Sequence, residues 1–299
     1  MLRLSNARII DPVQQLNAAP GALHVEGGRI VGDPGPHAVI DQDIDLGGAL
    51  VMAGAIDIHT HIGGGKVNIA RTLLGEDHRL DMRAARALDD GSWLHSGCGH
   101  ATPTTWATGY RYAEMGYTTC FEPAMLPANA RQAHLELGDT PMVDKGAYAM
   151  LGNDDFFLHL LASGAEPQTL ADYVGWTLDH TQAMALKVVN PGGISAFKFN
   201  IRNLDIDQLN PHYRVSPRQV LHALAQALHD LGVPHPLHVH ASNLGVPGNA
   251  DTTLATMQAA EGLPMHITHI QFHSYGTEGE RRSTAETTFE VPEGRDERR

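Results

Sequence analysis

The sequence predicts an α/β fold in which a parallel sheet is connected by crossover helices, preceded by a small β-sandwich. After about residue 50, apolar strand-like runs alternate with helical stretches, a pattern typical of parallel sheets. Before residue 50, short strands with alternating apolar and polar residues are separated by Gly and Pro residues. We therefore expect the β-sandwich to cover residues 1–50 and the α/β part to cover residues 51–275.

The expected strands of the α/β part are short apolar runs bounded by turn residues. They lie at 51–58, 117–122, 146–151, 185–189, 236–241 and 265–270. Helical stretches fall at 79–89, 104–115, 126–137, 153–163, 168–183 and 217–231. The last begins at Ser216-Pro217, a good N-cap followed by a first-turn proline. Residues 276–299 are charged and lack apolar periodicity, so we expect a disordered tail there.

Composition narrows the class of protein. The chain has 299 residues, 42% of them hydrophobic, and a net charge of −13, which argues against nucleic-acid or anionic-membrane partners. No apolar segment reaches the roughly 18 residues of a membrane span, and the first residues do not resemble a signal peptide, so we expect a cytoplasmic protein. Its 2 cysteines argue against a disulfide framework or a thiolate zinc site, whereas its 19 histidines offer imidazole ligands.

The first candidate site is His59-Thr60-His61, which follows an apolar run from Ala49 to Ile56 that we interpret as a buried strand. Side chains alternate along a strand, so both imidazoles would point the same way, about 6 to 7 Å apart. That spacing suits one metal ion. The alternative is two unrelated histidines in a loop, because so short a motif recurs by chance.

Lys187 is the second candidate, because it interrupts the apolar strand Ala185–Val189. Burying a charged lysine is costly unless the charge is paired or removed. A neutral lysine can react with carbon dioxide to form a carbamate, whose carboxylate can bridge a pair of metals. The alternatives are a lysine that extends from the strand end to pair with an acid, and Lys198, which lies in an equally apolar setting.

Histidines recur at the ends of the last expected strands. His238-Val239-His240 repeats the alternating pair, and His266, His269 and His273 follow. Each imidazole could bind metal, orient a ligand or pack in the core. Together with His59 and His61, histidines at three strand ends around the same edge predict a metal site.

Longer motifs around these residues resemble the A subunit of formylmethanofuran dehydrogenase and its relative, the hydrolase subunit of the bacterial formyltransferase/hydrolase complex. Both belong to the amidohydrolase superfamily. The motifs are His59-Thr60-His61, Lys66-Val67-Asn68 with Arg71, Lys187-Val188-Val189-Asn190-Pro191-Gly192-Gly193, His238-Val239-His240 with Asn243-Leu244-Gly245 and Pro247-Gly248-Asn249, and Thr268-His269-Ile270-Gln271-Phe272-His273-Ser274-Tyr275-Gly276. The resemblance extends to about Gly276.

The resemblance implies a (β/α)₈ barrel with a small β-sandwich, two zinc ions, and interconversion of an N-formyl furan-amine carrier with formate and the free amine. It also implies other subunits of a hetero-oligomeric complex. Carried onto this chain, His59 and His61 would bind one zinc, carboxylated Lys187 would bridge, and His240 and His269 would bind the second. Residues implied to bind substrate are Asn68, Arg71, Asn243 and His273. Lys187 is preferred over Lys198 because the family's bridging lysine precedes the Asn-Pro-Gly-Gly turn.

The sequence also departs from the family. Gly65 stands where proline is common. The aspartate at the end of strand eight has no counterpart, since Asp296 is the only aspartate beyond His273. Six expected strands make the barrel incomplete, and the catalytic acid stays unknown, with Glu122 as a candidate proton shuttle. The alternatives are a cyclic amidohydrolase of the dihydropyrimidinase type and an inactive scaffold or truncated subunit.

Overall fold

The structure is a computed structural model that describes residues 1–65, 67, 69, 105–192 and 205–276. The chain divides into two units, Met1–Ala55 and Ile56–Arg299. The expected helix at 79–89 and the tail from 277 onward lie outside the described residues. In the part of the chain that the structure describes, no helix is long and apolar enough to cross a membrane.

The N-terminal unit is one mixed β-sheet. Its strands are β1 (Leu2–Asp11), β2 (Leu16–Glu26), β3 (Arg29–Val31), β4 (Gln42–Asp45) and β5 (Leu50–Met52), in the order β3-β2-β1-β4 with β5 also paired to β1. β2 and β3 are joined by Gly27 and Gly28, whose positive φ angles of 57° and 77° suit a tight hairpin turn.

The described strands of this unit form a single layer rather than the predicted β-sandwich. β4 pairs in parallel with Leu2–Ser5 of β1, and β5 pairs in parallel with Arg8–Ile10 of the same strand. Because two short strands follow one another along the same edge of β1, both extend its sheet instead of building a second one.

The expected strand 51–58 is divided between two sheets. Leu50–Met52 forms β5 of the N-terminal sheet, and Ala55–Asp57 forms β6 of the second sheet. The prediction of a single buried strand was therefore wrong, and Ile56 is 61% exposed. Ala53 and Gly54 separate the two short strands, and His59 and His61 lie in the segment after β6.

The second sheet carries the α/β architecture. It has six strands in the order β11-β10-β9-β8-β7-β6, which follows the chain. Its further strands are β7 (Tyr117–Met125), β8 (Asp144–Met150), β9 (Ala185–Val189), β10 (Leu237–His240) and β11 (Met265–Ile267). The pairs from β7 to β11 are parallel, so their carboxyl ends share one edge. The predicted parallel α/β fold is confirmed, with the six described strands forming part of a barrel.

Helices follow the strands along the chain. They are α3 (Thr105–Glu114), the 3-10 turn η2 (Pro127–Asn129), α4 (Ala130–Gly138), α5 (Asp155–Ala162), α6 (Pro167–Thr181), α8 (Pro217–Asp230), α9 (Asn249–Gln258) and η3 (Ile270–Phe272). The sequence did not predict α9, because its buried positions include Ala250, Thr253 and Thr256 rather than large apolar residues. The N-cap of α8 is Ser216, as predicted, which forms a capping box with Gln219.

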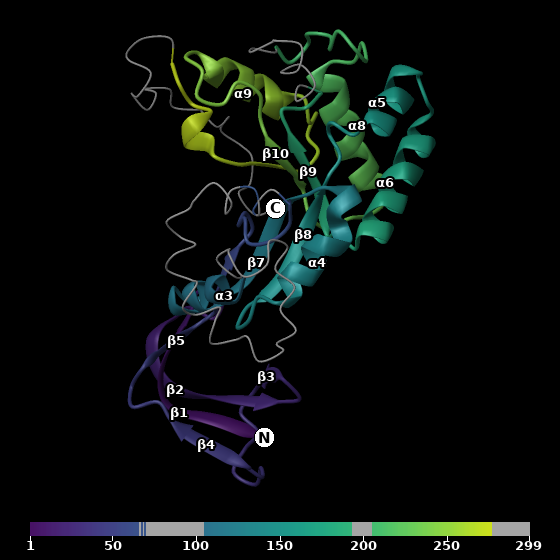
Figure 1. Cartoon of the computed structure of the whole chain (residues 1–299). Coiled ribbons are helices and arrows are strands. Elements are labelled where there is room, and N and C mark those ends of the chain that lie inside the picture. The colour runs from purple at the N-terminus through teal and green to yellow at the C-terminus, as the bar shows by residue number, and fades with distance from the viewer. Residues whose placement is uncertain (66, 68, 70–104, 193–204, 277–299) are drawn as a thin grey trace. The chain divides into compact units, whose positions relative to one another are not determined.

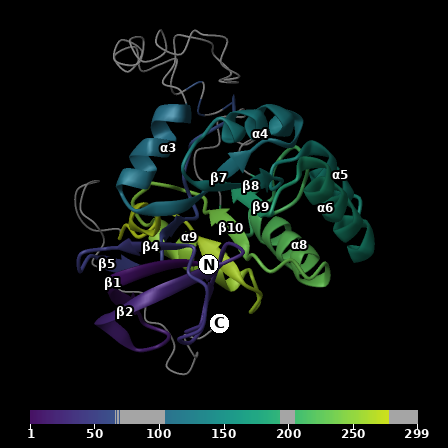
Figure 2. The same ribbon diagram turned by 90° about the horizontal axis from the view of Figure 1, so that it is seen from below.

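The core lies between the sheet and the helices on its outer side. Leu186 and Val188 of β9, Val239 of β10 and Leu221 and Leu224 of α8 are fully buried in one cluster. Figure 1 shows α6 and α8 side by side next to β8, β9 and β10. Figure 2 shows α4, α6 and α8 around the outer side of these strands. This packing leaves the carboxyl ends of the strands for the site.

Candidate metal centre

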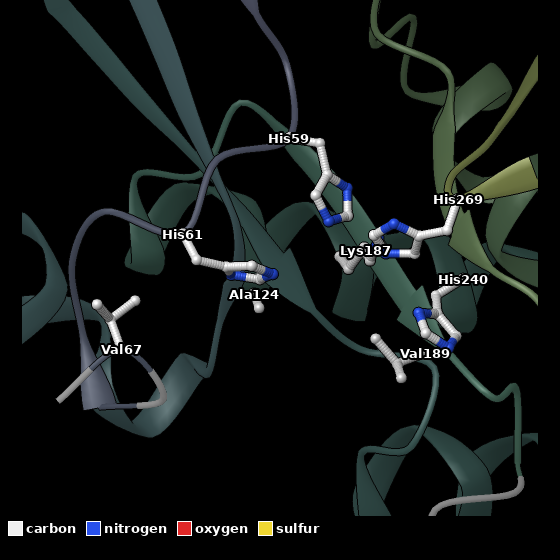
Figure 3. Close-up of a pocket in the computed structure, with 8 residues that line it drawn as sticks. All are labelled: His59, His61, Val67, Ala124, Lys187, Val189, His240 and His269. Carbon is white, nitrogen blue, oxygen red and sulfur yellow. The ribbon is translucent and has the colours of Figure 1, made fainter. Parts of the chain in front are cut away.

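A cavity of about 390 Å³ lies at the carboxyl ends of the strands. It is lined by His59, His61, Val67, Ala124, Lys187, Val189, His240 and His269 (Figure 3). The five residues expected to bind metal all belong to this lining, although they come from four separate parts of the chain. In Figure 3 the four imidazoles point toward the space in front of Lys187.

One ring nitrogen of His59 contacts a second histidine, and the other has no hydrogen-bond partner in the part of the chain that the structure describes. Its Nδ1 lies 2.8 Å from Nε2 of His238. Its Nε2 is buried and has no hydrogen-bond partner among the described residues. Burial, and after it the charge of Lys187, lowers the pKa of His59 to about 3. The imidazole is therefore neutral near pH 7, and in the tautomer in which Nδ1 donates to His238 the lone pair lies on Nε2, where a metal could bind.

His61 is held by a carboxylate. Its Nδ1 lies 3.1 Å from Oε1 of Glu122, a residue of β7 that is 1% exposed. The centres of the His59 and His61 rings are 5.2 Å apart, at nearly perpendicular planes. These two imidazoles are close enough to share one ion.

Lys187 is buried in the middle of β9, with 2% of its surface exposed. Its Nζ lies 3.4 Å from Oγ1 of Thr268, at the long end of the hydrogen-bond range. Its positive charge contributes to lowering the pKa of the neighbouring His269 and His266, although burial is the larger cause for both. Lys198, the rival candidate, lies outside the described residues.

His240 and His269 form the second pair. His240 is the last residue of β10, and His269 follows β11 by two residues. Their ring centres are 5.2 Å apart, and the ring of His269 is also 4.5 Å from that of His59. His269 has a positive φ of 52°, a conformation that is uncommon for residues other than glycine and that is frequent at functional sites.

Two further histidines lie behind this lining. His238 is 3% exposed, and its ring stacks on those of His59 and His266 at centre distances of 5.1 and 4.7 Å. Burial, followed by the charge of Lys187, lowers its pKa to about 2. The sequence left the roles of His238 and His266 open, and His238 supports His59 instead of lining the cavity. The signal that could have shown this is the alternation His238-Val239-His240, which puts both imidazoles on one face of β10 at different depths.

The residues expected to bind substrate are not among the described lining residues. The side chain of Asn243 donates to Thr252 Oγ1 over 3.3 Å. His273 is fully buried, its ring centre is 5.2 Å from that of His240, and burial lowers its pKa to about 4. Asn68 and Arg71 lie outside the described residues. Their roles stay predictions.

The donor atoms around the cavity fall into pairs. Among the described residues, no group of three or more His, Cys, Asp or Glu side chains is arranged to hold one ion. The cavity instead offers two pairs of imidazoles around one lysine. A carboxylate added to Lys187 would give each pair a third donor. Among the described residues, Nε2 of His59 is buried without a hydrogen-bond partner, so it could serve as one of the imidazole donors. The residues therefore fit a pair of metals that share a lysine-borne carboxylate.

The chain belongs to the amidohydrolase family, whose sequence profile matches residues 42–292. It is 42% identical over 281 residues to the A subunit of the formyltransferase/hydrolase complex Fhc of Methylorubrum extorquens, covering 92% of this chain and 48% of that protein. It is 37% identical over 284 residues to protein FwdA of Methanocaldococcus jannaschii, covering 91% of this chain and 48% of that protein. The chain thus spans about half the length of these relatives, and the resemblance predicted from the motifs is confirmed.

A solved structure extends this similarity to the fold. The crystal structure of the formyltransferase/hydrolase complex FhcABCD from Methylorubrum extorquens, in complex with methylofuran, contains a chain that matches with a TM-score of 0.81 and 41% identity. The match covers 92% of this chain and 49% of that chain. The amidohydrolase fold predicted from the sequence is confirmed.

Proposed function

We propose that this chain is a zinc-dependent amidohydrolase that interconverts an N-formyl furan-amine carrier with formate and the free amine. The observation that carries the proposal is the convergence of His59, His61, Lys187, His240 and His269 on one cavity. The similarity to a component of a hydrolase complex supports the reaction class. The methylofuran in the related crystal structure supports a furan-type carrier as substrate.

We assign one zinc ion to His59 and His61 and a second to His240 and His269, with carboxylated Lys187 between them. Zinc is borderline in softness and accepts imidazole and carboxylate ligands. When bound, it would act as a Lewis acid toward the formyl oxygen and lower the pKa of water. The neutral state of His59 and His269, whose pKa values are lowered by burial, keeps their lone pairs available for binding.

The carboxylate on Lys187 would form without another enzyme. The neutral amine attacks the carbon of carbon dioxide, a C–N bond forms, one C–O π bond becomes an oxygen lone pair, and one Nζ proton leaves to water. Burial of Lys187 at 2% exposure favours the neutral amine that this step needs. Starting from the neutral amine, this step places a negative charge in the middle of four imidazoles.

Hydrolysis of the formyl amine breaks the C–N bond, so the formyl carbon gains an oxygen from water and the amine nitrogen gains a proton. The residues of this chain would bind and orient the formyl group in the cavity, where Val189 and Ala124 place apolar surface beside the imidazoles. We also propose that the chain works in the cytoplasm with other subunits, because the relative is one component of a complex.

The test replaces a ligand and measures zinc directly. Elemental analysis should find about one zinc ion fewer per chain in His59→Ala than in the parent. The control is His180→Ala, at an exposed position on α6. Unchanged zinc content in His59→Ala would contradict the assignment.

Formate release then tests the substrate. We expect hydrolysis of formylmethanofuran-type amides, measured as released formate, and no hydrolysis of hydantoins, measured as N-carbamoyl amino acid. The reverse preference would favour the cyclic amidohydrolase alternative.

A further inference from the structure

Glu122 is a buried carboxylate that binds the segment carrying the first histidine pair. It lies in β7 and is 1% exposed. Its Oε2 accepts hydrogen bonds from the backbone N–H groups of Ile62 at 3.0 Å and Gly63 at 3.4 Å. Its Oε1 accepts from the N–H of Ala124 at 3.0 Å and faces Nδ1 of His61 at 3.1 Å. Four nitrogen atoms therefore surround one side chain, three of them obligatory donors.

This arrangement determines the protonation of His61. A carboxylate surrounded by donors favours a further donor at the fourth position, so Nδ1 of His61 carries its proton. In a neutral imidazole the other nitrogen, Nε2, then has the lone pair, and this ring lines the cavity. The arrangement does not suit the proton-shuttle role considered from the sequence, since Glu122 is not among the described lining residues.

A second buried carboxylate binds the next residue of the same segment. Glu136 of α4 is fully buried, and its Oε2 accepts from the backbone N–H of Gly64 at 2.7 Å. Gly64 has a positive φ of 91°, and a Cβ there would lie 3.3 Å from Cβ of Ala133. Glu136 therefore holds the backbone of the segment, as Glu122 does, and offers a comparison for the contact that Glu122 alone makes with His61.

We propose that Glu122 is a positioning residue that fixes His61 in the Nδ1–H form and turns its Nε2 toward the zinc ion. The inference rests on the proposed function, because it concerns the same metal centre. Carboxylates that hold the second nitrogen of a metal-binding histidine commonly contribute about 10- to 100-fold to metal affinity.

The variant that tests this role is Glu122→Gln. Its amide N–H₂ must face either Ile62 and Gly63 or Ala124 and His61, and both sides present backbone donors. This repulsion between two donors can be relieved only beside His61, because its Nδ1 can become an acceptor if the ring proton moves to Nε2. We expect zinc affinity, measured by chelator competition, to fall about 10- to 100-fold. Glu136→Gln should retain the affinity of the parent chain.

A double variant separates positioning from general damage. If Glu122 acts on zinc only through His61, adding Glu122→Gln to His61→Ala should cause no further loss of zinc affinity. A loss in the double variant equal to the sum of both single losses would overturn the inference. An equal loss in Glu136→Gln would overturn it too.

The parent chain supplies a measurement that does not depend on how the variant folds. In metal-free protein with isotope-labelled histidine, NMR should find His61 in the Nδ1–H form, and an Nε2–H form would overturn the inference. If the parent binds no zinc, the proposed function fails. If the parent binds zinc and Glu122→Gln binds it equally well, only the role of Glu122 fails.

Discussion

Acidification should destabilise the metal-free protein through its buried histidines. His238 and His273 are 3% and 0% exposed. Burial, followed by the charge of Lys187, lowers the pKa of His238 from 6.5 to about 2. Burial, followed by His269, lowers that of His273 from 6.5 to about 4. Both imidazoles are therefore neutral in the folded protein at pH values where the unfolded chain protonates them.

The direction of the change in the free energy of unfolding follows from proton linkage. Below 6.5 the unfolded state binds more protons than the folded state, so the free energy of unfolding falls as the pH falls. The loss continues until the folded protein itself is protonated, near pH 4 for His273 and near pH 2 for His238. Each histidine should contribute a loss of about 1.4 kcal/mol at about pH 5.5 relative to neutral pH, roughly 3 kcal/mol for the pair.

Urea unfolding followed by circular dichroism, with a chelator present, measures this loss at about pH 7.5 and about pH 5.5. In His238→Asn the pH-dependent loss should be smaller by about 1.4 kcal/mol. His180→Asn, at an exposed position, controls for the removal of an imidazole. A free energy of unfolding that does not change with pH, or an equal loss in parent and His238→Asn, would refute the reasoning.

Three further predictions concern Lys187, Gly109 and Ser216. Lys187→Ala should lose the paired zinc, and short carboxylic acids in excess should partly restore it in elemental analysis, since they replace the bridging carboxylate. Gly109→Ala should lower the free energy of unfolding in urea by about 1 to 3 kcal/mol, because the new Cβ would overlap the carbonyl oxygen of Pro141 and lie 2.8 Å from its nitrogen. Ser216→Ala should lower it by about 1 kcal/mol through loss of the α8 cap, measured in the same way.

Each of these three predictions has a matched control variant. Lys198→Ala should keep the zinc, and the opposite result would transfer the bridging role to Lys198. Gly138→Ala adds a Cβ that meets nothing within 4 Å, so equal destabilisation of Gly109→Ala and Gly138→Ala would rule out the clash with Pro141 as the cause. A Ser216→Thr variant retains a hydroxyl and should keep most of the stability that Ser216→Ala loses.

The sequence was sufficient to predict strands and helices where the local residue pattern and the burial of the segment agree. The strands β8 and β9 are apolar throughout most of their length and lie within two residues of their predicted ranges. Ser216 and Pro217 marked the start of α8 because capping depends on neighbouring residues alone. α9 was missed because it buries Ala and Thr, which give little apolar periodicity.

Pairing between distant segments required the structure. The run from Ala49 to Ile56 is uniform in character, and only the competition of two sheets for it separates β5 from β6. The cavity also depends on bringing distant segments together. The sequence and its family resemblance supplied His59, His61, Lys187, His240 and His269 as candidates, and the structure places all five around one cavity.

By itself, the sequence determined the α/β class and most strands and helices, because these depend on residue type and near neighbours. It offered several histidines and two lysines as candidate ligands, and the resemblance to the amidohydrolase family selected five of them. Only the tertiary structure decided which nitrogen of each imidazole is held. His59 contacts His238 and His61 contacts Glu122, partners 179 and 61 residues away in the chain. Such contacts depend on side-chain direction across separate strands, which no spacing along the chain records.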